Sequence, residues 1–407
     1  MITLRDAEHV ASAWARRESL RRGHRCAPMV SEFDIGYVVW MREPAGDLPS
    51  PGDSVSTVID KETGRVSTWP RLPSAVIKDM YRRRRTDVVA PTLTADPAFE
   101  LLRTARRRPT PTVAARLSVR YRPFVGRGAK GDQELRHHRL VRRALAEIEV
   151  GALDRGAERH AELVAVSDVL HTFDSDRAQQ GLPPLTDDEA GALLADAQLE
   201  ALHVREPGDP LGGAPAVTCW SCRRTLARLG VAAAGAAKES ERAGEPTRAG
   251  LSEDDALGVL RDAGWTGPPG ADQARQWIDT VCAVGGLERR HEVFPAASQA
   301  LTRFGGLTSD RHGPGERRRV RPVRLDAAAA AHTADQLGEF AVLIGARLFP
   351  IGVEGAAEAV LAVDERSRVF AIDQAGEWFV GGSVEAALAT LLTGGPVARV
   401  HDDGSWL

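Results

Sequence analysis

The alternation of hydrophobic and polar positions predicts a small mixed domain at the start of the chain. Val10 and Trp14 form a helical apolar stripe after Thr3, which has Asp6 three positions later in the pattern of a capping box. The predicted elements that follow are a strand at 33–44, a β-hairpin at 56–69 with its turn at 61–64, and a helix at 73–85. This order predicts an α+β domain in residues 1–86.

Strand and helix patterns alternate in the middle of the chain, between residues 99 and 232. Thr186 is a good N-cap residue, and Gly230 is expected to end the last helix. The predicted elements are a strand at 112–123, helices at 137–148, 157–173 and 185–197, a strand at 199–208 and a helix at 218–231. Such an alternation predicts an α/β layered sheet.

Residues 233–250 contain no large apolar residue and predict a flexible or weakly helical linker. The last domain is predicted at 251–398, beginning with a helix capped by Ser252. Its other predicted elements are strands at 359–374 and 376–382 and a helix at 383–395. The chain as a whole is therefore predicted to be an α/β multidomain protein, with a central layered sheet between two smaller α+β domains.

Composition narrows the class of protein. Hydrophobic residues make up 43% and charged residues 27%, as in globular domains, and the net charge of −3 excludes a polycation. There are four cysteines, of which Cys26 and Cys282 are isolated in the sequence. We therefore expect a reducing compartment and no disulfide framework. The beginning of the chain has no secretory signature, and no apolar run reaches membrane-spanning length. A cytoplasmic location follows as an expectation.

Two short motifs in the middle domain carry candidate chemistry. Cys219 and Cys222 form a Cys-x-x-Cys at the start of a predicted helix, where the helix dipole favours the thiolate that zinc requires. With His160 they supply three protein ligands and leave the fourth tetrahedral position for water, the pattern of a catalytic zinc site. Glu162, two residues after His160, is expected to move protons between that water and the substrate rather than bind the metal.

Other interpretations of these cysteines fit less of the sequence. A Cys-x-x-Cys also occurs in redox pairs and in structural zinc sites. A four-cysteine zinc site is excluded because no second Cys-x-x-Cys occurs, and a redox pair leaves His160 and Glu162 unexplained. His-x-Glu followed by Cys-x-x-Cys is the signature of the zinc deaminases. The motifs together favour a deaminase site.

Three stretches of the middle domain carry a family resemblance: GAKGD (128–132), ERHAELVAVSD (158–168) and REPGDPLGGAPAVTCWSC (205–222). They resemble the YwqJ-like deaminases of bacterial polymorphic toxin systems. The resemblance implies a cytidine-deaminase-like fold, a bound zinc, and attack of zinc-bound hydroxide on C4 of cytosine or C6 of adenine. Thr218 stands where the wider pattern has proline, and as a good N-cap it is expected to begin the helix. The long segment between the two motifs is expected to be an inserted helix over the site.

The outer domains resemble immunity families. EFDIGYVVW (32–40) and VIDKETGRVSTWP (58–70) resemble the YrhB-like immunity family. GVLRDAGW (258–265), FPAASQALTRFGGL (294–307) and residues 361–395 resemble the third group of the SUKH superfamily. These resemblances imply domains that bind toxin domains through a surface, without catalysis and without a cofactor.

A strongly basic region between Arg103 and Arg143 suggests how a substrate is bound. It could attract phosphates, or it could be the solvated surface of an arginine-rich protein. His137 and His138 are read as surface or base-contacting residues, and Trp220 either stacks on a flipped base or packs in the core. The candidate substrate-binding residues are Arg127, Lys130, Asp132, His138 and Trp220.

The sequence therefore predicts a zinc-dependent hydrolytic deaminase that acts on a nucleobase in nucleic acid or nucleotide and is linked to a toxin–immunity system. Its candidate partners are the nucleic acid or nucleotide substrate and the toxin domains that the outer domains bind. No membrane partner is expected. The alternative is a non-catalytic immunity protein that neutralises toxin domains, and a metabolic deaminase of free nucleotides is a third option. The intact His160, Glu162, Cys219 and Cys222 argue against a relic deaminase.

Overall fold

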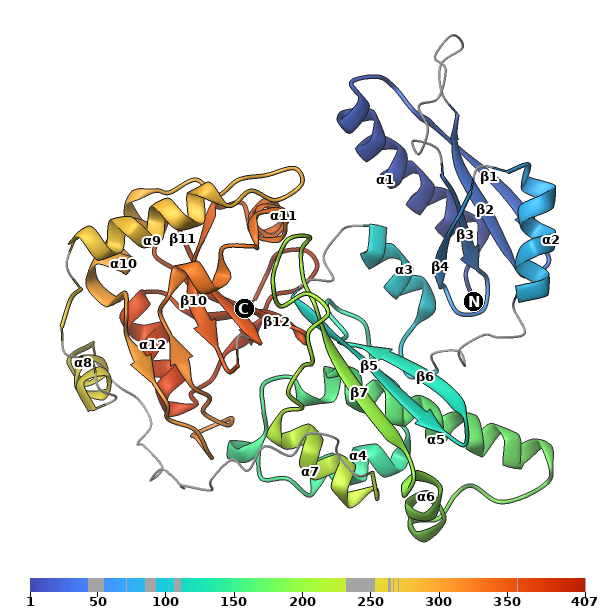
Figure 1. Ribbon diagram of the computed structural model, residues 1–407. Coiled ribbons are helices and arrows are strands. Elements are labelled where there is room, and N and C mark those ends of the chain that lie inside the picture. The colour runs from blue at the N-terminus through green and yellow to red at the C-terminus, as the bar shows by residue number, and fades with distance from the viewer. Residues whose placement is uncertain are drawn as a thin grey trace. The chain divides into compact units, whose positions relative to one another are not determined.

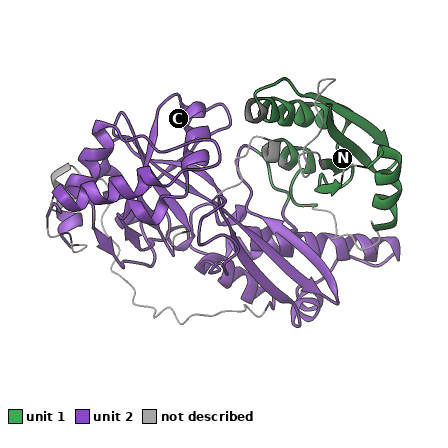
Figure 2. Cartoon of the chain, turned by 45° about the horizontal axis from the view of Figure 1, so that its top comes forward, with its two compact units in different colours: residues 1–108, 133–136 green, residues 109–132, 137–407 purple. Residues whose placement is uncertain are grey.

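The computed structural model shows a mixed α/β multidomain protein with several antiparallel sheets (Figure 1). It describes residues 1–42, 55–70, 72–84, 93–105, 111–231, 253–262, 265, 267–269, 271–356 and 358–406. The chain divides into two compact units, one of residues 1–108 and 133–136 and one of residues 109–132 and 137–407 (Figure 2). The predicted linker at 233–250 and the predicted cap Ser252 lie outside the described residues.

The first unit is a four-stranded antiparallel sheet with helices on both faces. Its elements are α1 (Leu4–Arg22), β1 (Ala27–Phe33), β2 (Gly36–Arg42), β3 (Val55–Asp60), β4 (Val66–Pro70), α2 (Ser74–Arg84) and α3 (Pro97–Ala105), and the strand order is β1-β2-β3-β4. The predicted capping box is confirmed, because the Thr3 side chain accepts from Asp6 N and the Asp6 carboxylate accepts from Thr3 N. The predicted hairpin with its turn at 61–64 is also present.

Alternation along the strands of this unit divides its core in two. Tyr37 and Val39 on β2 pack toward α1, and Val38 between them packs on the opposite face with Ile77 of α2. Helix α3 spans the expected start of the middle domain at residue 99. Its Leu101 is buried in the α1 cluster, so α3 packs with the first unit.

The middle domain, in the second unit, is a three-stranded antiparallel sheet of order β6-β5-β7. Its elements are β5 (Thr112–Val119), β6 (Arg122–Arg127), α4 (Arg139–Ala146), α5 (Ala161–Gln179), α6 (Asp187–Leu194), β7 (Gln198–Val204) and α7 (Trp220–Arg228). The backbones of β6 and α5 approach closely (Figure 1), and a Cβ at Gly126 would lie 2.2 Å from the Ala161 carbonyl oxygen. The buried helix α5 is therefore fixed tightly on the sheet.

Two expectations for the middle domain were wrong. The segment 112–123 is not one strand, because Arg120 and Tyr121 both have positive φ, 48° and 66°, and turn the chain into β6. Two non-glycine residues in this conformation give little turn signal in a sequence. The segment between the motifs does form α6, begun by the predicted cap Thr186, but α6 packs beside Gly230 at the C-terminal end of α7. The cysteines lie at the other end of α7, so α6 does not cover them.

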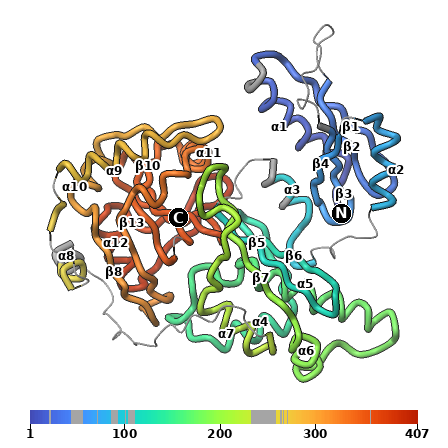
Figure 3. The backbone as a smooth tube through the Cα atoms, in the orientation of Figure 1, coloured from blue at the N-terminus to red at the C-terminus, as the bar shows by residue number. Residues whose placement is uncertain are grey.

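The C-terminal domain is built on a seven-stranded antiparallel sheet of order β14-β13-β12-β11-β10-β9-β8, and its course can be followed in Figure 3. Phe349 and Leu361 pack on one face of this sheet, and Phe370 packs on the other. The elements are α8 (Glu253–Asp262), α9 (Ala271–Ala283), α10 (Pro295–Phe304), β8 (Thr308–Ser309), β9 (Val323–Arg324), α11 (Ala334–Ile344), β10 (Leu348–Glu354), β11 (Ala359–Asp364), β12 (Val369–Asp373), β13 (Gly376–Gly381), α12 (Val384–Thr393) and β14 (Ala398–Arg399). Among the described helices, none has the length and apolar character needed to cross a bilayer.

A buried histidine makes the stability of the C-terminal domain sensitive to acid. His291 lies against Phe349 with its Nε2 3.1 Å from the Ala331 carbonyl oxygen, and burial lowers the pKa of His291 to about 4. The unfolded chain takes up a proton near pH 6.5, so this contribution to the free energy of unfolding is complete above that pH and is lost as the pH falls toward 4.

We expect His291→Phe to reduce the loss of stability between pH 7 and pH 4.5 by about 2–3 kcal/mol. The measurement is urea unfolding at several pH values, with the exposed His9→Phe as the control. Equal pH slopes for the parent chain and His291→Phe would contradict the assignment.

Candidate active site

The two motifs meet at the N-terminal ends of two helices. His160 is the N-cap of α5, with extended backbone, and Glu162 lies in the first turn of that helix. Cys219 is the N-cap of α7, where its Sγ accepts a hydrogen bond from Cys222 N at 3.4 Å. Two details of the sequence analysis are thereby corrected: His160 precedes its helix, and the N-cap is Cys219 instead of Thr218. A thiol can accept the N3 amide, so the helix begins one residue later.

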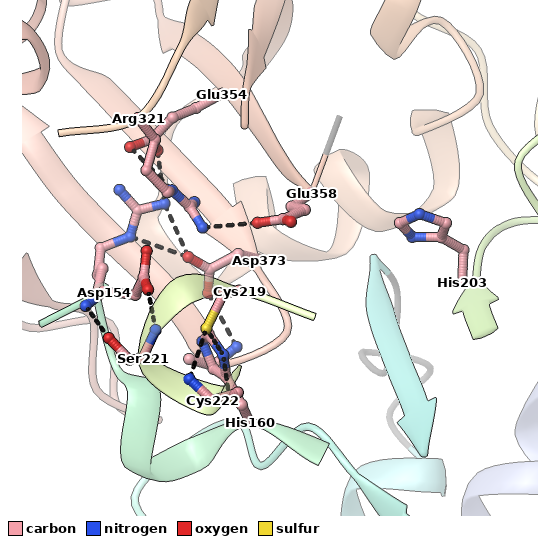
Figure 4. Close-up of polar contacts among 12 residues, drawn as sticks. Asp154, His160, His203, Cys219, Ser221, Cys222, Arg321, Glu354, Glu358 and Asp373 are labelled. Carbon is pink, nitrogen blue, oxygen red and sulfur yellow. Dashed lines mark hydrogen bonds and ion pairs between the residues drawn. The ribbon is translucent and has the colours of Figure 1, made fainter. Parts of the chain in front are cut away.

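The three candidate ligands lie close enough to share one ion (Figure 4). His160 Nδ1 is 3.3 Å from Cys219 Sγ and 3.5 Å from Cys222 Sγ, and all three side chains are buried. With Zn–S bonds of about 2.3 Å and Zn–N bonds of about 2.0 Å, tetrahedral ligand atoms lie roughly 3.5–3.8 Å apart. The distances between these residues therefore fit a zinc ion. Within the described part of the chain, the imidazole and the two thiols form a group that could hold a metal ion.

The surroundings of the site raise the pKa of two of these groups, which favours their protonated forms. Burial lowers the pKa of His160, but interactions with Cys219, Glu162 and Asp373 together outweigh burial and raise the pKa of His160 to about 10. Burial also raises the pKa of the Cys222 thiol well above its ordinary value. A divalent cation that binds here must displace these protons, as metal binding generally does.

Glu162 has one carboxylate oxygen available for chemistry. Its carboxylate receives a hydrogen bond from the Thr218 side chain, whereas Oε2 has no hydrogen-bond partner among the described residues. Burial raises the pKa of Glu162, opposed by the nearby His160. A buried carboxylate with a raised pKa and a free oxygen is suited to take and return a proton.

Two residues that the sequence analysis missed hold the motifs together. Ser221 N donates to Asp154 Oδ2 at 2.9 Å, and Asp154 N donates to Ser221 Oγ at 2.8 Å. This reciprocal pair connects the loop before α5 with the first turn of α7 (Figure 4). The position of Ser221 between the cysteines was the only signal in the sequence, and its partner is 67 residues away.

Three family models match successive parts of the chain. An Immunity protein 35-like domain matches residues 5–87, the YwqJ-like deaminase family matches residues 102–231, and the SUKH-3 immunity protein family matches residues 252–394. The chain carries a YwqJ-like deaminase domain between two immunity domains. The predicted order of families is confirmed, with the N-terminal match described as Immunity protein 35-like where the sequence analysis named the YrhB-like family. Comparisons with curated proteins and with solved structures give no match.

Three of the five candidate substrate-binding residues of the deaminase domain contact the SUKH domain. Their side chains are directed to partners more than 90 residues away in the chain. Lys130 Nζ lies 3.5 Å from a Glu377 oxygen, Asp132 pairs with Arg399 and His401, and Trp220 lies under the Arg319 guanidinium at 4.8 Å. Any contact of these residues with substrate would have to replace those partners.

The other two candidates lie elsewhere in the deaminase domain. His138 is the N-cap of α4, accepting from Leu140 N at 3.3 Å, and its Nε2 is 2.9 Å from an Asp174 oxygen. Arg127 is exposed at the end of β6. Among the other arginines of the basic region, Arg116 and Arg142 are also exposed, whereas Arg106, Arg107 and Arg108 lie outside the described residues.

Proposed function

We propose that the deaminase domain is a zinc-dependent hydrolytic deaminase of cytosine or adenine, acting on the base in nucleic acid or in a nucleotide. The observation that supports this most strongly is the set of His160, Cys219 and Cys222 ligand atoms beside the free oxygen of Glu162. A zinc ion held there would activate a water molecule and polarise it for attack on the base.

The residues then have separate roles. His160, Cys219 and Cys222 hold the metal, and their burial keeps bulk water away from it. Glu162 accepts a proton from the attacking water and delivers it to the amino group that leaves as ammonia. The balance is one water consumed, one C–N bond broken, and the amino group replaced by a carbonyl oxygen.

A second function, binding of toxin domains, is favoured by the two immunity families that flank the deaminase domain. On this proposal the surfaces of the outer domains recognise proteins, and the deaminase is one component of a toxin–immunity system. The four cysteines are all free, which supports our proposal that the protein acts in the reducing cytoplasm.

The test is deamination by the zinc-loaded full chain, with the Glu162→Gln chain as the matched control. Each protein is incubated in excess over single-stranded DNA, RNA, cytidine and adenosine nucleotides, and products are read by sequencing or mass spectrometry. We expect conversion of cytosine to uracil or adenine to hypoxanthine above the Glu162→Gln background in one of these substrates. A chain that binds no zinc, or that converts none of them even in the variants described below, would leave toxin binding as the better function.

A further inference from the structure

The SUKH domain contacts the residues that carry the candidate metal site. Gln374, in the turn between β12 and β13, accepts a hydrogen bond through Oε1 from the backbone N–H of Ala161 at 3.2 Å. This N–H belongs to the first turn of α5, where no carbonyl of the helix can accept it. Ala161 stands between His160 and Glu162. The Gln374 side chain is therefore hydrogen-bonded to the residue that lies between the candidate ligand His160 and the proton-transfer residue Glu162.

A buried ion cluster includes Asp373, the residue before Gln374, and Figure 4 shows it with Glu354, Arg321 and Glu358. Arg155, five residues before His160, donates through Nε and Nη2 to Asp373 Oδ2 at 2.9 and 2.8 Å, and Nη2 is 2.8 Å from a Glu354 oxygen. Arg321 pairs with Glu354 and Glu358 on the SUKH side. Because an unpaired buried charge is strongly unfavourable, Arg155 ties the loop that leads into the site to the SUKH domain.

Glycines of the deaminase domain allow the SUKH backbone to approach. A Cβ at Gly151 would lie 2.3 Å from the Gly315 carbonyl oxygen, and one at Gly128 would lie 2.4 Å from the Gln374 carbonyl oxygen. Gly315 N also donates to the Gly151 carbonyl at 2.8 Å. These positions have no room for any side chain, so the two surfaces are closely complementary.

The deaminase domain also completes a helix of the SUKH domain. Thr333, the N-cap of α11, makes no side-chain capping bond of its own. The Glu206 carboxylate caps the helix instead, accepting hydrogen bonds from Gln336 N at 2.7 Å and from Asp335 N at 3.3 Å. A carboxylate at a helix N-terminus is favoured by the helix dipole. Glu206 therefore adds a contact between the domains at a second place.

The hydrogen bonds and ion pairs between the two domains are supplemented by packing of Gly156 against Ala375 and Trp378, which belong to an apolar cluster of the SUKH domain. The three apolar clusters of the SUKH domain take all their residues from positions 259–406. The bonds across to the deaminase domain are ion pairs, backbone hydrogen bonds and caps. Domain interfaces of this mixed kind commonly open and close.

We propose that the SUKH domain inhibits the deaminase domain of its own chain, by covering the metal site with its β12–β13 turn. This rests on the function proposed above. His160 and Glu162 are 2% and 1% exposed. On this proposal a base reaches Glu162 only when the turn moves away from the site. The partner of this immunity domain is thus the deaminase domain to which it is joined.

Two variants of the full chain separate the surfaces from opposite sides. Gly151→Ala places a methyl group against Gly315, which supplies the three atoms nearest to the added Cβ. Gln374→Ala removes the acceptor at Ala161. The control is Gly191→Ala on α6, whose Cβ would meet nothing within 4 Å. None of these residues belongs to the proposed metal or proton-transfer groups.

The first measurement is the rate at which a chromophoric chelator removes zinc, which does not depend on activity. We expect removal to be about tenfold faster or more in Gly151→Ala and Gln374→Ala, because overpacking and a lost buried bond both favour the open state. Gly191→Ala should match the parent chain. The second measurement is deamination of single-stranded DNA and RNA, which is expected to rise by a similar factor in the same two variants.

The outcomes separate this proposal from the proposed function. Unchanged zinc removal in both variants would overturn the covering of the site. Faster zinc removal with slower deamination would overturn inhibition and show that the turn completes the active site. Faster zinc removal without deamination by any protein would support the covering while counting against the deaminase function.

Discussion

The Cys222→Ala chain is expected to lose its zinc almost completely. Cys222 is fully buried at the first turn of α7, and its Sγ, 3.5 Å from His160 Nδ1, is one of the three candidate ligand atoms. A site with two protein ligands cannot complete the tetrahedral set, and even outer-shell changes cost roughly 10–100-fold in metal affinity. We therefore expect zinc binding to weaken by more than about 100-fold. Elemental analysis and competition with a chelator measure this.

The matched control for this loss is Cys282→Ala, a partly buried cysteine of the SUKH domain outside the ligand group. It should retain the zinc content of the parent chain. Cys219→Ala should behave like Cys222→Ala. Full zinc occupancy in both the Cys219 and the Cys222 variants would remove the proposed site.

Glu162→Gln should abolish most deamination while leaving the metal in place. Glutamine keeps the size of the side chain and a hydrogen-bonding group for Thr218, but it cannot accept the proton of the attacking water. Acid–base groups contribute about 10²–10⁴-fold to rate, so we expect a loss in this range. Zinc content should not change, because Glu162 is not in the ligand group.

The rate is best compared in two backgrounds, the parent chain and the Gly151→Ala chain, so that covering of the site does not hide the effect. Glu200→Gln, an exposed carboxylate of β7, is the control. Glu162→Gln chains that unfold would make Glu162 a structural residue. Loss of zinc from the Glu162→Gln chains would show that Glu162 is a metal ligand. Unchanged activity would exclude it as the proton-transfer residue.

The sequence by itself determined the features that depend on neighbouring residues. The capping box at Thr3 and the N-cap at Thr186 were predicted and are present, and Thr186 also forms a capping box with Glu189. Such caps need only a suitable residue within the same helical turn. The order of the three families and the pairing of His160 with the Cys-x-x-Cys were also predictable, because each motif is a short local pattern. The three ligand atoms do meet, although 59 residues separate His160 from Cys219.

Tertiary structure alone decided which distant surfaces meet. Gln374 is 213 residues from Ala161, and nothing in its local pattern distinguishes it from an ordinary turn residue. Lys130 and Trp220 could be read from the sequence as substrate contacts, but in the folded chain they face SUKH residues. A local pattern fixes caps and turns because the bonds that stabilise them lie within one segment. The partner of a buried charge is chosen only when the domains pack, since only then does leaving that charge unpaired become costly.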